Sequence, residues 1–130
     1  MLTRKNTETG FEEILLSLRK NTGYRDGEYE LPGGHVEDGE DLMQAMVREA
    51  KEELMIAVQE KDLKIIHILH HYKGNRINFI LKTDTYEGEP CVGEKDKCEK
   101  LEWFDIKNLP NNITPKVKKS IKEIEEGIFH

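Results

Sequence analysis

Residues 31–56 read LPGGHVEDGEDLMQAMVREAKEELMI, and this stretch decides both the fold and the chemistry of the chain. It opens with a Pro-Gly-Gly run, which breaks regular structure and predicts a loop. From Asp41 to Leu54 apolar residues recur at helical spacing, so the sequence predicts a helix there. Asp41 is placed to cap its start, and Gln44, three residues on, would be the reciprocal partner in a capping box. The apolar face of this helix would contain Leu42, Met46, Val47, Ala50 and Leu54.

Three glutamates of this helix, Glu49, Glu52 and Glu53, stand at positions i, i+3 and i+4 and therefore share one face. At ~100° per residue that face falls beside the apolar one, at the margin of the core, where a cleft can form. Like charges held together repel one another unless a cation neutralises them. Hard oxygen ligands of this kind select Mg²⁺ or Mn²⁺. A solvated acidic helix face would give the same pattern of glutamates. The surrounding residues are therefore needed to distinguish a metal site from such a face.

Those surroundings follow a longer pattern: Gly34, five residues, Glu40, seven residues, then Arg-Glu-Ala-x-Glu-Glu from Arg48 to Glu53, followed by apolar Ile56. This pattern closely resembles the Nudix box of the MutT-like pyrophosphohydrolases, and the preceding Pro-Gly matches the family's usual lead-in. The stretches 21–40, 88–104 and 108–110 look like one bacterial-type branch of the family. Met55 departs from the pattern, because the family commonly has Gly there to end the helix in a left-handed conformation. The sequence leaves the end of the helix open.

The resemblance implies a single domain over residues 1–130 with an α/β/α sandwich fold, in which a mixed sheet has helices on both sides. The residue pattern gives an order of strands, helix, strands, helix that agrees with it. Strands are predicted at residues 14–18, 29–31, 64–71, 76–83 and 101–104, and the N-terminal strand looks short. Loops are predicted at 21–27 and 86–100, with a hairpin turn at 73–75.

A second helix is predicted near the end of the chain, with Thr114 as its N-cap, Pro115 as its first residue and Gly127 as its stop. Its lysines come early and its glutamates late, so its charges oppose its dipole. A solvated face is the usual explanation of such a pattern.

Carried over residue by residue, the resemblance implies that the box binds a divalent metal, Mg²⁺ or Mn²⁺. Family members often add an acidic residue from outside the box, and Glu94 is favoured here over Asp96 and Glu99. Arg48 would orient Glu49 by a charge-assisted hydrogen bond, unless it forms only a surface ion pair. A metal-bound water would be the nucleophile, and Glu49 or Glu53 would take its proton. The implied metal ligands are Gly33 through its carbonyl, Glu49, Glu52, Glu53 and Glu94, while Gly34 would allow close approach of the backbone and Glu40 would brace the loop.

Basic residues near the expected cleft are candidates to hold substrate phosphates, namely Arg19, Lys20 and Arg25, although each is individually explained by a solvated charge. Tyr24, Tyr29 or Phe79 could stack on a base, but aromatic core packing is the commoner fate. A zinc site at His67, His70 and His71 is conceivable, but no fourth ligand lies at recognisable spacing.

The function implied is a hydrolase of a nucleoside diphosphate linked to another group, such as a nucleoside triphosphate or an oxidised one. Two other classes stay open: a catalytically silent Nudix-fold module that binds nucleotides, and an isomerase of isoprenoid diphosphates, which would need a catalytic cysteine. The net charge of −6 argues against nucleic-acid partners and suits a substrate bridged by cations. No apolar run approaches a membrane span, and residues 1–10 lack the apolar core of a signal peptide. We therefore expect a cytoplasmic protein with reduced Cys91 and Cys98, and homodimers are common among relatives.

Overall fold

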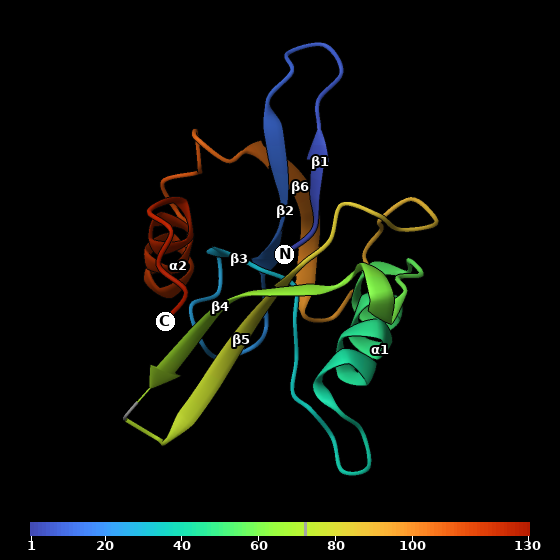
Figure 1. The fold of residues 1–130 in the computed structure, drawn as a ribbon. Helices are drawn as coiled ribbons and strands as arrows, with labels where there is room; N and C mark the ends of the chain where they lie inside the picture. The colour runs from blue at the N-terminus through green and yellow to red at the C-terminus, as the bar shows by residue number, and fades with distance from the viewer. Residues whose placement is uncertain (72) are drawn as a thin grey trace.

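Two helices enclose the strands of the protein from opposite sides (Figure 1). The computed structural model describes residues 1–71 and 73–130. The elements follow the predicted order of strands, helix, strands, helix, and the α/β/α layering is confirmed. Their bounds are β1 (Thr3–Lys5), β2 (Glu12–Arg19), β3 (Tyr29–Glu30), α1 (Leu42–Leu54), a short 3₁₀ helix (Glu60–Asp62), β4 (Lys64–His71), β5 (Arg76–Lys82), β6 (Cys98–Asp105) and α2 (Pro115–Glu125).

Strand β2 is the centre of the sheet, since it pairs in antiparallel fashion with β1, β3 and β6. Strands β4 and β5 form a separate antiparallel hairpin. A parallel bridge between Leu2 and Thr83 connects these two parts, and a second parallel bridge joins Tyr29 of β3 to Ile113 before α2, so the strand directions are mixed. In the hairpin turn, Gly74 and Asn75 both have positive φ, which suits the tight reversal predicted at 73–75.

Side chains of β2 alternate between two halves of the core, as the two-residue period of a strand requires. Ile14 and Leu16 pack with residues of α2, including Val117 and Ile121. Leu15 points the other way and packs with Leu54 and Ile56 at the end of α1. Both faces of β2 are therefore buried, which fixes the two helices on opposite sides of it.

Both predicted helices are present, with the predicted first residues. The capping box of α1 is complete: the Gln44 N–H donates to Asp41 Oδ1 and the Asp41 N–H donates to Gln44 Oε1, each at 2.8 Å. Met55 ends α1 with φ 56° and ψ 35°, the left-handed conformation for which the family commonly uses Gly. Thr114 occupies the N-cap of α2, but its side chain makes no capping hydrogen bond. Neither helix, nor any other helix in residues 1–71 and 73–130, is long and apolar enough to span a membrane.

Strand ends differ most from the prediction. Strand β2 spans Glu12–Arg19 and β6 spans Cys98–Asp105, so both are longer than the apolar runs at 14–18 and 101–104. Their polar ends are held by each other, as in the pairing of Glu13 with Asp105, which local composition does not reveal. The long loop predicted at 86–100 consequently loses its last residues to β6, β5 ends at Lys82, and the 3₁₀ helix was not predicted.

Candidate functional site

Glu49 is a buried carboxylate, with only 8% of the residue exposed to solvent. Its side chain lies against the loop that precedes α1, at Gly34. A Cβ atom on Gly34 would stand 2.2 Å from Glu49 Oε1, a distance that two nonbonded atoms do not tolerate. Sequence analysis assigned Gly34 to close approach between backbone and metal. The structure shows close approach between the backbone and Glu49 itself.

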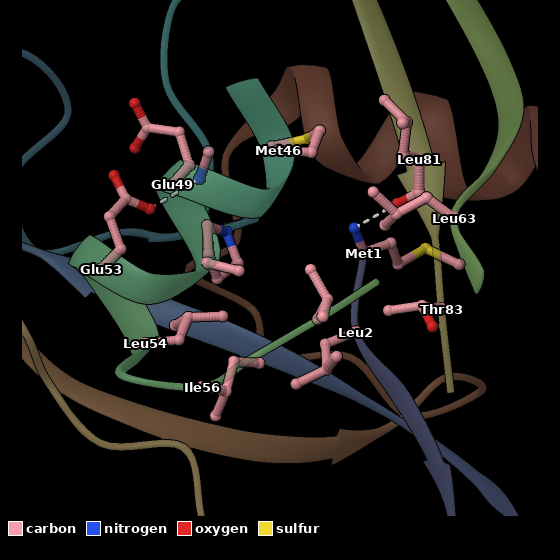
Figure 2. A pocket seen from close by; sticks show the side chains of 14 residues that line it. Met1, Leu2, Met46, Glu49, Glu53, Leu54, Ile56, Leu63, Leu81 and Thr83 are labelled. Atoms are coloured by element: carbon pink, nitrogen blue, oxygen red, sulfur yellow. Dashed lines mark hydrogen bonds between the residues drawn. The ribbon is translucent and has the colours of Figure 1, made fainter. Parts of the chain in front are cut away.

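Glu53 lies one turn further along α1, beside Glu49 (Figure 2). The Gly33 N–H donates to Glu53 Oε2 at 2.9 Å. Burial, followed by the negative charges of Glu49 and Glu94, raises the pKa of Glu53 to about 8. The Gly33 N–H acts in the opposite direction but does not offset these effects. The pair is thus a site of concentrated negative charge in a poorly solvated place.

Arg48 joins the loop to the helix glutamates. Its Nη2 donates to Glu40 Oε1 at 2.7 Å and its Nε to Glu40 Oε2 at 3.1 Å, a two-point contact. Its Nη1 donates to Glu49 Oε1 at 2.8 Å and to Glu52 Oε2 at 3.1 Å. The His35 carbonyl also accepts from Nη2, at 2.9 Å. The contact predicted between Arg48 and Glu49 is present, and it belongs to a network rather than to an isolated surface ion pair.

Glu40 braces the loop from within. Besides Arg48, it accepts from the Glu37 N–H at 2.8 Å, which closes the turn before α1. Both contacts favour the carboxylate form and hold the pKa of Glu40 below its usual value. The geometry matches the supporting role implied by the resemblance.

The loop that contains Glu94 docks on the C-terminal end of α1. The Gly93 N–H donates to the Glu53 carbonyl at 2.9 Å, and the Cys91 N–H donates to the Leu54 carbonyl at 3.0 Å. A Cβ on Gly93 would stand 1.9 Å from the Glu52 carbonyl oxygen, so this contact requires glycine. Docking brings the charge of Glu94 to bear on Glu53. Sequence analysis favoured Glu94 but did not identify Gly93, for which the only signal was a glycine within a polar loop.

A cavity of about 50 Å³ lies beside Glu49 and Glu53 (Figure 2). Apolar side chains form most of its wall, among them Met46, Leu54 and Leu81. The amino group of Met1 also lines it and donates to the Leu81 carbonyl at 2.6 Å. Burial lowers the pKa of this amino group to about 5. The two glutamates therefore border the apolar interior, which is the cause of their poor solvation.

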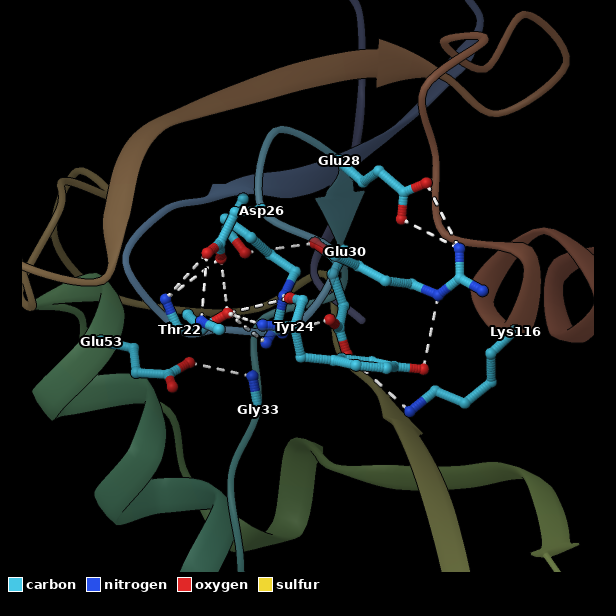
Figure 3. A network of polar contacts seen from close by, with 12 residues as sticks. Thr22, Tyr24, Asp26, Glu28, Glu30, Gly33, Glu53 and Lys116 are labelled. Carbon is cyan, nitrogen blue, oxygen red and sulfur yellow. Dashed lines mark hydrogen bonds and ion pairs between the residues drawn. The ribbon is translucent and has the colours of Figure 1, made fainter.

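Two of the predicted phosphate-binding residues, Arg19 and Arg25, contact Tyr24, Glu28 and Glu30, which are labelled in Figure 3. Arg19 forms an ion pair with Glu30 and donates to the Tyr24 carbonyl at 2.8 Å, so its guanidinium is already occupied. Arg25 contacts Glu28 and the Tyr24 hydroxyl, each at 3.4 Å. Within residues 1–71 and 73–130, neither these arginines nor Lys20 forms an ion pair with Glu49 or Glu53.

The candidate stacking residues have different environments. Tyr29 is buried and packs edge-on against Phe104, so it belongs to the core and is not free to stack on a ligand. Tyr24 is 63% exposed, and the Arg19 and Arg25 guanidinium groups lie 5.6 and 5.7 Å from its ring centre. Phe79 is also exposed, on β5. Tyr24 remains the candidate nearest to the basic residues.

In the described part of the chain, no three His, Cys, Asp or Glu side chains lie close enough together to hold a metal ion. Of the histidines considered for zinc, His67 is fully buried and pairs with Glu123. Of the glutamates, Glu49 and Glu53 face the Gly33–Gly34 loop, whereas the Glu52 side chain is 51% exposed and turns toward Arg48.

The donor chemistry of the site nevertheless fits a hard divalent cation. The groups are carboxylates, and burial, followed by the charges of Glu49 and Glu94, raises the pKa of Glu53, so a nearby positive charge would favour its ionised form. A cation would relieve that repulsion, with Glu49, Glu53 and Glu94 as the groups whose charges act together. Glu52 would join only if its contact with Arg48 were exchanged for the cation.

Comparison with known proteins identifies the family. The family model described as NUDIX domain matches residues 2–124. An ADP-ribose pyrophosphatase of Methanocaldococcus jannaschii is 37% identical over 100 residues, which are 75% of this chain and 57% of that protein. An oxidized purine nucleoside triphosphate hydrolase of Danio rerio is 35% identical, over 75% of this chain and 61% of that protein. The chain thus spans about three-fifths of the length of these relatives.

Solved structures give the same result for the fold. The MutT NUDIX hydrolase from Burkholderia pseudomallei superposes with a TM-score of 0.74 and 31% identity, over 85% of this chain and 86% of that one. The segment that the family model matches contains the glutamates of α1. It also contains Arg48, which joins them to the preceding loop, and Gly34, which makes room for Glu49. This chain belongs to the Nudix family.

Proposed function

We propose that this protein is a divalent-cation-dependent hydrolase that cleaves a diphosphate bond in a nucleoside diphosphate linked to another moiety. One observation carries the proposal: the Gly33–Gly34 loop docks directly on the carboxylates of Glu49 and Glu53. Glycine at position 34 makes room for the Glu49 carboxylate, which holds the two acidic groups next to the backbone of the loop. Burying two carboxylates together costs stability, so a site that retains them has a use for a cation.

The ligands of the cation, Mg²⁺ or Mn²⁺, would be Glu49, Glu53, the Gly33 carbonyl and Glu94, with Glu52 as a further one. When bound, the metal neutralises phosphate oxygens and lowers the pKa of a water molecule. Arg48 holds Glu49 in place through one nitrogen and is itself anchored by Glu40. Glu49 or Glu53 accepts the proton of the attacking water. The apolar wall behind them excludes other water and strengthens these electrostatic interactions.

The names of the relatives suggest two substrate classes, ADP-ribose and oxidised purine nucleoside triphosphates. Both contain a purine and a diphosphate bond. Exposed Tyr24, flanked by Arg19 and Arg25, is a candidate to stack on the purine. Lys20 follows Arg19 at the end of β2 and is a candidate to contact phosphate. We propose further that the protein works in the cytoplasm, on small molecules rather than nucleic acid, with a homodimer as its expected assembly.

A catalytically silent nucleotide-binding module is the second candidate. The observation in its favour is that Arg48 already lies between Glu49 and Glu52 and supplies positive charge there. The isomerase has less support, because the Cys98 thiol donates to the Lys100 carbonyl and burial raises its pKa, which disfavours a reactive thiolate.

A turnover assay separates these candidates. ADP-ribose, 8-oxo-dGTP and unmodified dGTP are each incubated with the protein in Mg²⁺, in Mn²⁺ and in EDTA. The nucleoside monophosphate product is measured: AMP, formed with ribose 5-phosphate, from ADP-ribose, and the corresponding deoxynucleoside monophosphate, formed with pyrophosphate, from each triphosphate. We expect at least one substrate to be cleaved with either metal and none in EDTA. Glu125→Gln, an exposed substitution on α2, is the matched control for any glutamate variant of α1. Binding of these nucleotides without any cleavage would favour the silent module.

A further inference from the structure

A groove with a basic lining lies between the end of β4 and the start of α2, away from the glutamates of α1. Its volume is about 260 Å³. We call it the basic groove, and its lining residues are Leu69, His70, His71, Lys73, Lys116 and Lys119. Five of these six side chains are lysines or histidines and none is acidic, in a chain whose net charge is −6. The three lysines concentrate positive charge in a hollow, which attracts anions.

The nearest carboxylates do not neutralise the lysines of α2. Lys116 lies 3.8 Å from Glu30, but Glu30 already forms an ion pair with Arg19. Lys119 lies 3.8 Å from Glu123 Oε1, but the other oxygen of Glu123 is 2.8 Å from His67 Nε2. Each carboxylate thus has a closer partner than the lysine.

The N-terminal end of α2 also lacks a side chain that would interact favourably with its helix dipole. Its first turn contains no acidic residue, and the Thr114 side chain does not cap it. The Thr114 hydroxyl is buried and has no hydrogen-bond partner among the described residues. The first N–H groups of a helix favour an anion, whereas Lys116 and Lys119 oppose the helix dipole there. An anion in the basic groove would interact favourably with Lys116 and Lys119, which line it, and would offset the positive charge that they add to the start of α2.

A histidine adds a hydrogen-bonding group. His71 Nε2 lies 3.1 Å from the Asn78 side-chain nitrogen. The ring of His71 has a second nitrogen, Nδ1, that can take part in a further hydrogen bond. Two features that have no role in the metal site thus lie together in the basic groove. They are the early lysines of α2 and the histidines at the end of β4.

From these observations we propose that the basic groove binds the phosphate group of a small ligand, at a site separate from the carboxylates of Glu49 and Glu53. Lys116 and Lys119 supply charge, and His71 supplies a hydrogen bond. The volume admits a phosphate with an attached group of about the size of a sugar. The phosphate comes either from the free inorganic ion or from a phosphate ester, and the same contacts would hold both.

The test is binding in EDTA, so that it does not depend on the metal site or on turnover. Inorganic phosphate and ribose 5-phosphate are titrated separately into the whole protein, and Kd is measured from histidine ring NMR signals. We expect the signals of His70 and His71 to shift, while those of His35, in the loop before α1, and His130 stay in place. Tighter binding of ribose 5-phosphate would identify the ester as the source, and equal binding would identify the free ion.

The double variant Lys116→Gln/Lys119→Gln should weaken Kd at least tenfold. Lys118→Gln/Lys122→Gln is the matched control, because it removes the same charge from the exposed side of the same helix and should change Kd less than twofold. Thermal melts of both variants check that each is folded. The proposal is overturned if neither probe shifts His70 and His71 at millimolar concentration, if the two variants lose affinity equally, or if His35 is the histidine that responds.

Discussion

The Glu49 carboxylate occupies the space where a side chain at position 34 would begin. A Cβ built on Gly34 would stand 2.2 Å from Glu49 Oε1 and 2.3 Å from its carboxyl carbon. The loop and the helix therefore fit together only when residue 34 is glycine. Because the backbone conformation at this position is not left-handed, the requirement is one of space rather than of dihedral freedom.

Gly34→Ala should displace either the loop or Glu49 and so lower stability by about 1–3 kcal/mol, as other overpacked sites do. Gly33→Ala is the matched control, because a Cβ at position 33 would meet nothing within 4 Å. Thermal melts in EDTA measure both. Equal melting temperatures for the two variants would contradict the close contact.

The contact of Arg48 with Glu49 could be predicted from the sequence because the contacts within the box are local. Arg48, Glu49 and Glu40 lie within ten residues of one another, so helical spacing and one loop suffice to place them. The loop at residues 91–94 could not be placed in the same way. Its docking on Glu53 and Leu54 joins chain segments about 40 residues apart. A glycine in a polar loop, such as Gly93, predicts a turn but does not indicate which distant residue it contacts.

Pairing between distant strands also explains why Tyr29 and Arg19 have contacts that the sequence did not predict. Tyr29 is in the core because β3 pairs with β2 and its ring meets Phe104 of β6. Arg19 is engaged because the same pairing brings Glu30 beside it. Neither partner follows from local sequence, whereas the helix caps, the hairpin turn and the buried stripe of β2 do.

Met55→Gly should leave the protein as stable or make it more stable, by about 1 kcal/mol. Met55 has φ 56°, and its residue is 60% exposed, so glycine removes a steric penalty and little packing. Lys51→Gly, in the regular part of the same helix, should instead destabilise by about 1 kcal/mol. Urea unfolding measures both. A clear loss in Met55→Gly would show that the contact of its sulfur with Cys91 Sγ, at 3.4 Å, stabilises the helix end.

Arg48→Lys should fail to replace arginine. A lysine has one ammonium group and cannot contact Glu40 at two points while also reaching Glu49, Glu52 and the His35 carbonyl. We expect a melting temperature several degrees lower and a fall in kcat, since Glu49 is no longer held. Arg76→Lys, an exposed change on β5, is the control. Wild-type turnover in Arg48→Lys would show that charge alone is sufficient at this position.

Glu53→Gln separates catalysis from folding. It should lower kcat by about 10²–10⁴-fold, the range for loss of a group that transfers a proton. In EDTA the variant should be more stable than the wild type near pH 7, because glutamine is neutral in both states, whereas Glu53, with a folded pKa of about 8, must take up a proton on folding. Glu125→Gln should match the wild type in both measurements.

The stability of the folded protein should depend on pH through the ionisation of Glu53. Because the folded pKa of Glu53 lies above its ordinary value of 4.5, the folded protein binds a proton more tightly than the unfolded chain does. Its contribution to stability is therefore complete below pH 4.5 and is lost as the pH rises to about 8. The slope reaches at most about 1.4 kcal/mol per pH unit. Melts in EDTA should show this loss in the wild type and a flatter profile in Glu53→Gln.

Magnesium should reverse the order of the two proteins. A cation that binds the folded state adds RT ln(1 + [L]/Kd) to its stability, and the wild type, with the complete set of carboxylates, should gain more than Glu53→Gln. A silent module with a structural Glu53 predicts the opposite pattern: the variant is less stable than the wild type in EDTA, and Mg²⁺ changes neither. Melts with and without Mg²⁺ beside one turnover assay decide between them. If Glu53→Gln cleaves substrate as fast as the wild type, Glu53 has no part in the reaction and the assignment of the site is wrong.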